Sequence, residues 1–169
     1  MKKYQKDFGY SYSAGVFPTL ELLTHRPDEI LQIFVDSKGL QNGGVSKIRE
    51  MAKEKQINVE VNDKAASTIS EKENMYCVGV FKKFESPLTP KSNHVVLVEP
   101  SDHGNLGTII RSMVGFNIIN LAIIKPAVDI FDPKVVRSSM GAIFHINFSY
   151  YGTFEDYQKT NLNQNLYPF

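Results

Sequence analysis

The sequence predicts an α/β protein made of two small layered domains. Two continuous apolar runs, "HVVLVEP" (94–100) and "INLAIIKP" (119–126), are typical of strands that are buried on both faces of a parallel sheet. An amphipathic stretch lies between them, which gives a strand, helix and strand joined by a right-handed crossover. In the first half of the chain, short strands alternate with helices, as they do in a small α/β layer structure.

The first domain is expected over residues 1–84. Apolar residues at helical spacing predict a short helix over 13–25, with Ser13 as its cap. The other expected elements of this domain are, in order, a strand over 29–37, a helix over 45–56 after the turn "NGG", a strand over 57–62, a short helix capped by Asp63 and a strand over 76–84.

The second domain is expected over residues 94–169, after a linker at 85–93. The linker "ESPLTPKSN" has two prolines, two serines and no periodicity. In the second domain, Asp132 and Pro133 predict the cap and first position of a short helix. We expect a third strand over 142–151.

Composition favours a globular protein with a buried core and no general affinity for nucleic acid. The chain has 169 residues, 42% of them hydrophobic, and its 19 Lys and Arg balance 18 Asp and Glu. Any RNA site must therefore be a local patch. The single cysteine, Cys77, excludes an internal disulfide and suits a reducing compartment. Because neither a signal peptide nor a membrane span is apparent, we expect a soluble cytoplasmic protein without a membrane partner.

The stretch "EPSDHGNLGTIIRSMVGF" (99–116) contains the first candidate site residues. Gly107 and Arg111 lie four residues apart on one flank of the expected helix, and Asn105 falls at its cap. The start of this helix should lie at the carboxyl end of the preceding strand, where open α/β sheets bind ligands and free N–H groups suit phosphate. Gly107 is expected to leave room for a ligand. An arginine on a helix flank is more often a solvated charge.

Together with a later segment, this stretch resembles the SpoU/TrmH family of RNA ribose 2′-O-methyltransferases. The motif Asn105-x-Gly107-x-x-x-Arg111 resembles the first signature of the family, and "DPKVVRSSMGAIFHINF", with Arg137 and Ser139, resembles its middle segment. The two segments occur in the order and spacing of the family. Residues 1–88 resemble the family's N-terminal RNA-binding domain, a small α/β module like certain ribosomal proteins.

The resemblance implies a SPOUT-type parallel-sheet domain that transfers methyl groups from S-adenosylmethionine to RNA. It implies that Asn105 and Arg111 are catalytic residues beside the target ribose, and that Gly107, Arg137 and Ser139 bind substrate. A guanidinium is permanently charged and can bind phosphate through two hydrogen bonds, so we expect Arg111 to position and stabilise rather than to abstract a proton. The family usually forms homodimers, and ribosomal RNA is a better expected partner than transfer RNA.

Two further family motifs are not found in residues 142–169. These are a Gly-Glu turn and a stretch with Ile-Pro and Ser-Leu-Asn, which form the knot that holds the methyl donor. We therefore expect the knot to be missing and the donor site to be incomplete, which leaves open whether this chain is an enzyme. The alternative is a non-catalytic RNA-binding fragment or truncated gene product. A nucleotide-binding α/β protein is less favoured, because no glycine-rich phosphate loop follows the strand at 94–98.

A basic cluster on the helix after "NGG" is a second candidate RNA contact. Lys47 and Arg49 belong to it, and they either bind RNA phosphates or form a solvated face with Glu50 and Glu54. The four histidines show no metal-ligand spacing, so no metal site is expected.

Overall fold

The computed structural model describes residues 2–69, 75–161 and 165–168. Its helices and strands are, in chain order, β1 (Tyr10–Ala14), α1 (Val16–His25), η1 (Pro27–Glu29), β2 (Ile30–Val35), η2 (Ser37–Gly39), α2 (Gly43–Glu54), β3 (Val59–Val61), α3 (Asp63–Ile69), β4 (Cys77–Lys82), β5 (His94–Val98), α4 (His103–Gly115), β6 (Asn120–Ile124), α5 (Pro133–Ser138), η3 (Ala142–His145), β7 (Asn147–Tyr151) and α6 (Phe154–Thr160). No helix in these ranges is long and apolar enough to cross a membrane.

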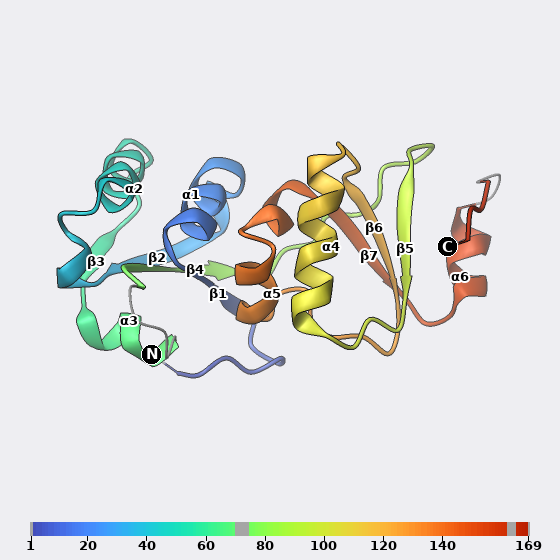
Figure 1. The fold of residues 1–169 in the computed structure, drawn as a ribbon, viewed down its shortest axis with the longest axis horizontal. Helices are drawn as coiled ribbons and strands as arrows, with labels where there is room; N and C mark the ends of the chain where they lie inside the picture. Colours follow the sequence, from blue (N-terminus) through green and yellow to red (C-terminus); the bar gives the residue numbers. More distant parts are fainter. Residues whose placement is uncertain (1, 70–74, 162–164, 169) are drawn as a thin grey trace.

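The first sheet has four strands in the order β1-β4-β2-β3. Strand β4 pairs antiparallel with both β1 and β2, whereas β3 pairs parallel with β2. Helices α1 and α2 cover one face of this sheet and α3 lies on the other (Figure 1). Each face buries its own apolar cluster: Leu23, Ile33 and Ile48 pack beneath α1 and α2, and Tyr12 and Val78 pack on the opposite face.

The second sheet is the expected parallel one, with the strand order β5-β6-β7. Helices α4 and α5 lie on one of its faces and α6 on the other (Figure 1). Leu106, Ile110 and Met113 form the buried stripe of α4, as their helical spacing predicts. On the other face, Tyr157 of α6 (Phe154–Thr160) packs against Ala122 of β6.

The two sheets share a continuous apolar core. Phe81 of β4 and Phe84 contact Phe144 of η3, with the Phe81 and Phe144 ring centroids 5.1 Å apart. Arg26, just after α1, donates from Nε to the carbonyl oxygen of Phe144 at 3.2 Å, and its guanidinium carbon lies 4.5 Å from the centre of the Phe84 ring. The division into 1–84 and 94–169 remains a prediction, but the two parts pack against each other.

Three sequence expectations are wrong in detail. Ser13 does not cap a helix: it lies in β1, and α1 begins only after Gly15, whose φ of 108° turns the chain. The strand expected over 142–151 starts late, because Gly141 adopts a left-handed conformation and residues Ala142–His145 form a 3₁₀ turn. Strand β5 was expected to be buried on both faces, but β6 is its only described neighbour and Val98 is 62% exposed.

Candidate functional site

The start of helix α4 lies where the parallel strands end. The backbone N–H of Glu99, after β5, donates to Ile124 of β6 at 3.0 Å, and that of Lys125, after β6, donates to Tyr151 of β7 at 2.9 Å. The N–H of Val128 donates to the carbonyl of Pro100 at 3.0 Å. These bonds tie the loops after the three strands to one edge, which is the ligand-binding edge in open α/β sheets.

Asp102 is the cap of α4, and the expectation that Asn105 caps it is wrong. The Asp102 carboxylate accepts the backbone N–H of Asn105 at 2.7 Å, so Asn105 lies in the first helical turn. A carboxylate is favoured at this position, because it accepts a free N–H group and also stabilises the positive end of the helix dipole. The amide side chain of Asn105 is exposed, and no hydrogen bond to another described residue engages it.

Arg111 is exposed on α4 and forms no hydrogen bond or ion pair with any described residue. It follows Asn105 by six residues, which places it about 9 Å further along the helix axis and about 120° around it. The two side chains are therefore on the same rigid helix but not on one stripe. A guanidinium with all its donors unused is available to bind an anion.

Gly107 serves the packing of α4 on α5, and the expectation that it leaves room for a ligand is wrong. A Cβ at this position would lie 1.9 Å from Oγ of Ser138, 2.8 Å from the backbone nitrogen of Ser139 and 2.8 Å from the carbonyl oxygen of Val135. The space above Gly107 is thus filled by the neighbouring helix. The glycine brings the two helices that carry the family-like motifs into direct contact.

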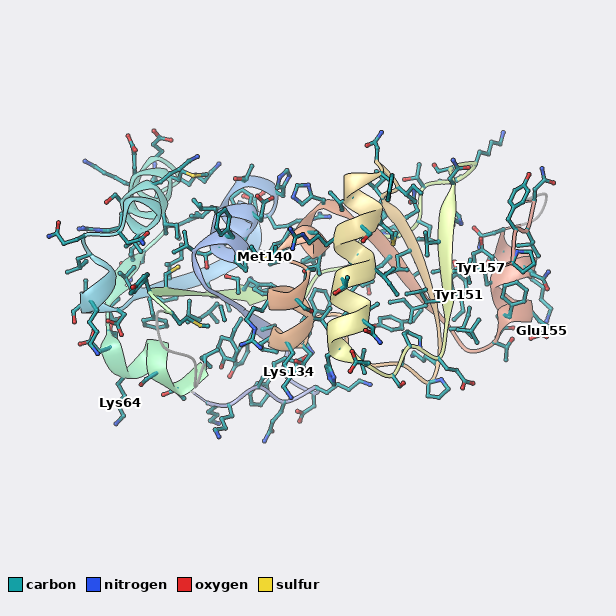
Figure 2. The ribbon with its side chains drawn as sticks, viewed as in Figure 1. Lys64, Lys134, Met140, Tyr151, Glu155 and Tyr157 are labelled. Atoms are coloured by element: carbon teal, nitrogen blue, oxygen red, sulfur yellow. The ribbon has the colours of Figure 1, made fainter. Side chains whose placement is uncertain are left out.

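Helix α5 begins as expected, with Asp132 accepting the N–H of Lys134 at 2.8 Å and Pro133 at the first position. The Ser139 side chain is buried and its Oγ donates to the carbonyl of Val136 at 2.9 Å, and the expectation that Ser139 binds substrate stays a prediction. Arg137 is half-buried. Figure 2 shows Lys134 at the start of α5, at the same end of the molecule as the first turn of α4.

A cleft of about 540 Å³ lies between the N-terminal segment, α3 and α5. Its lining is mixed: it includes the basic Lys134 and Arg137, the acidic Asp132, and Tyr4 and Tyr12, of which Tyr12 is buried. The Tyr4 hydroxyl donates to Asp129, and burial together with this carboxylate raises the pKa of the phenol, which therefore stays neutral. Positive charge beside aromatic rings is typical of surfaces that bind single-stranded RNA.

A second cleft, of about 650 Å³, lies at the carboxyl ends of β6 and β7. Its lining includes Lys6, Lys125, Asp129 and Tyr150. The Lys125 ammonium lies 5.5 Å from the centre of the Tyr150 ring, and Lys83 forms an ion pair with Asp129 at 2.9 Å. Burial raises the pKa of Tyr150 to about 12. Sequence reasoning did not select these residues, although Lys125 directly follows the β6 strand.

Lys47 and Arg49 do not belong to this edge. They lie on α2, which packs on α1 in the first domain, far along the molecule from α4 (Figure 1). Both side chains are exposed, and neither forms an ion pair with Glu50, Glu54 or any other described residue. They are free to contact phosphates, but as a separate patch.

The second half of the chain is similar to known methyltransferase sequences. Residues 92–168 match the model of the SpoU rRNA Methylase family. Over 68 residues the chain is 40% identical to the mouse protein named rRNA methyltransferase 3, mitochondrial. This aligned stretch covers 38% of this chain and 16% of the relative. Over 52 residues it is 40% identical to 23S rRNA (uridine(2479)-2′-O)-methyltransferase of Streptomyces viridochromogenes, covering 31% of this chain and 18% of the relative.

Comparison with solved structures matches nearly the whole fold. An rRNA methyltransferase from Sinorhizobium meliloti superposes with a TM-score of 0.72 at 24% identity, over 92% of this chain and 61% of that one. The SpoU methyltransferase AviRb from Streptomyces viridochromogenes, in complex with AdoMet, gives a TM-score of 0.74 at 20% identity, over 90% of this chain and 59% of that one. The chain thus spans about three fifths of these structures. Residues 92–168 therefore resemble the SpoU rRNA Methylase family, and the fold of the chain resembles that of these methyltransferases.

Proposed function

We propose that this chain takes part in 2′-O-methylation of ribosomal RNA, with Asn105 and Arg111 at the target nucleotide. The observation that carries the proposal is the position of these two side chains. Both lie within the segment that matches the SpoU family, both are exposed and unpaired among the described residues, and both project from the helix that starts at the ligand-binding edge of the sheet.

Arg111 binds and orients the RNA backbone in this proposal. Its guanidinium can donate two parallel hydrogen bonds to a phosphate, which fixes the position of the neighbouring ribose. Because its pKa lies far above neutrality, it acts by charge and position and not as a general base. The Asn105 amide both donates and accepts, so it can hydrogen bond to a ribose hydroxyl.

S-adenosylmethionine is the proposed methyl donor, because two of the solved relatives are named as AdoMet-bound rRNA methyltransferases. When bound, it supplies an activated methyl group for the ribose oxygen. We infer that the described residues of one chain do not hold this donor by themselves, because none of their buried side-chain polar atoms lacks a hydrogen-bond partner and seven of the sixteen residues that line the two clefts are lysine or tyrosine. In this proposal the described residues of one chain provide the RNA-facing side of the reaction, and a second copy of the chain in the homodimer proposed below completes the donor site.

The RNA follows the cleft between the N-terminal segment, α3 and α5 in this proposal. Lys134 and Arg137 line this cleft, together with Tyr4 and Tyr12. Both basic residues lie on α5, the helix that contacts α4 at Gly107. The names of the relatives favour ribosomal RNA as the substrate. We extend the proposal to a cytoplasmic homodimer. The exposed apolar side chain of Val98, 62% accessible on β5, favours a partner surface at that strand.

The test is transfer of tritiated methyl groups from S-adenosylmethionine to rRNA transcripts, with the 169-residue chain and with Arg111→Ala. Lys159→Ala is the matched control, since Lys159 is a basic residue, 77% exposed, on α6 at the opposite side of the sheet. We expect incorporation that falls at least tenfold in Arg111→Ala and stays unchanged in Lys159→Ala. RNA binding without incorporation in all three proteins would instead support a non-catalytic RNA-binding protein.

A further inference from the structure

We propose that Glu21, His25 and His145 form a binding site for a divalent transition-metal ion, of which Zn²⁺ fits best. Glu21 and His25 lie on α1, beside the first sheet, and His145 ends the 3₁₀ turn η3, which packs beside the second sheet. Each residue offers one ligand atom, and the three atoms lie within 4.8 Å of one another. The proposal is independent of the methyltransferase function.

The geometry is close to that of a tetrahedral zinc site. Nε2 of His25 lies 3.5 Å from Oε2 of Glu21, and Nε2 of His145 is hydrogen bonded to the same carboxylate oxygen. Zinc binds imidazole nitrogen and carboxylate oxygen at about 2.0–2.2 Å, which places neighbouring ligands about 3.4 Å apart around a tetrahedral ion. The 3.5 Å spacing of His25 and Glu21 already matches this value, and the other ligand atoms, all within 4.8 Å of one another, would reach it through small side-chain rotations.

Two backbone features hold the three residues together. Glu21 and His25 are four residues apart on one helix, so both side chains project from the same face. His145 reaches them from 124 positions away in the chain because Gly141, with a φ of +83°, starts η3 directly against α1. A Cβ on Gly141 would lie 2.8 Å from Cβ of Glu21. The close approach therefore depends on a glycine whose backbone conformation other residues rarely adopt.

The charges around the cluster suit a cation. Glu21 supplies a negative ligand, and the nearby Arg26 guanidinium is engaged in hydrogen bonds to the Phe144 carbonyl at 3.2 Å and to Oγ of Ser86 at 3.1 Å.

The cluster is accessible, with side chains 26–37% exposed, so an ion can enter from solvent and water can complete its coordination. Two histidines, one carboxylate and a water are a common zinc ligand set. An ion held in this way would clamp α1 to η3, at the junction of the two sheets.

The test is calorimetric titration of ZnCl₂ into the EDTA-treated full chain. We expect one saturable site, loss of affinity of at least about tenfold in Glu21→Gln, His25→Ala and His145→Ala, and no loss in His103→Gln. His103 is the matched control because its side chain is also 37% exposed and also faces one carboxylate, that of Asp132, at 3.5 Å, but has no second histidine.

Two further measurements distinguish zinc binding at this cluster from nonspecific binding to the protein surface. Co²⁺ in place of zinc should give the intense visible absorption of a tetrahedral complex, which His25→Ala should abolish. Zinc should also raise the melting temperature of the wild-type chain and leave that of Glu21→Gln, a variant that keeps the hydrogen bond to His145, unchanged. The proposal is overturned if no saturable site is found, or if His103→Gln weakens binding as much as the three cluster variants do.

Discussion

Replacement of Gly107 by alanine should destabilise the protein because it forces α4 away from α5. The new methyl group would lie 1.9 Å from Oγ of Ser138 and 2.8 Å from two backbone atoms of α5. The serine hydroxyl cannot move aside without loss, since it hydrogen bonds to the carbonyl of Lys134 at 2.8 Å. Backbone atoms have no rotamer to change, so the helices themselves must shift.

The expected cost follows from two opposing effects. Overpacking of this kind costs about 3 kcal/mol at the upper end of its usual range, and alanine recovers about 1 kcal/mol of helix propensity over glycine, which leaves a net loss of about 2 kcal/mol. For a chain of this length, such a loss lowers the melting temperature by about 4–8 °C. Gly115 is the matched control on the same helix, because nothing lies within 4 Å of a Cβ built there.

The assay is urea denaturation followed by circular dichroism, with both variants measured beside the wild type. We expect Gly107→Ala to unfold at lower urea and Gly115→Ala to unfold at equal or higher urea, with a gain of up to about 1 kcal/mol. Equal stability of the two variants would refute the conclusion that Gly107 exists for helix packing. Such a result would instead support the expectation that Gly107 leaves room for a ligand.

Three other variants or reagents test separate parts of the structure. Gly141→Ala should cost about 1–3 kcal/mol in the same urea assay, because it combines a left-handed φ of +83° with a clash at 2.8 Å from Cβ of Glu21. The thiol of Cys77 should resist iodoacetamide at pH 8 in the folded protein and react in 6 M urea, because burial raises its pKa to about 12 and removes it from solvent; fast alkylation of the native protein would contradict this. Lys47→Glu combined with Arg49→Glu should weaken RNA binding and flatten its dependence on salt, as measured by fluorescence anisotropy, and unchanged affinity would remove α2 from the RNA path.

The elements predicted best from the sequence are those whose signal is local. The apolar run of β6 is fully buried as predicted, and Asp132 with Pro133 starts α5 as predicted, because a cap and a fixed proline φ act within one turn. The buried face of α4, with Leu106, Ile110 and Met113, was also predicted correctly from the spacing of its apolar residues. Strand β1 was missed because its sequence, "YSYSA", has little aliphatic character and gains its burial only from pairing with β4.

The surroundings of several site residues depend on contacts between distant parts of the chain and could not be predicted from local sequence patterns. Arg111 is exposed on α4, as a charged residue on a helix flank should be, whereas Gly107 lies at the α4–α5 contact, which cannot be predicted without knowing that these helices touch. The expectation of no metal-ligand spacing considered only histidine pairs close in the chain. It missed the cluster that His145 forms with Glu21, because that contact depends on the fold as a whole.

The proposed reaction is tested most directly by locating the transferred methyl group on the RNA. After incubation with tritiated S-adenosylmethionine, the rRNA is hydrolysed with alkali, which needs a free 2′-hydroxyl to cut the neighbouring phosphodiester bond. A methylated ribose therefore protects that bond. If Arg111 and Asn105 serve ribose methylation, the label will appear in alkali-resistant dinucleotides and will be strongly reduced with Arg111→Ala. Label recovered in mononucleotides, or equal labelling by the wild type and Arg111→Ala, would contradict the account.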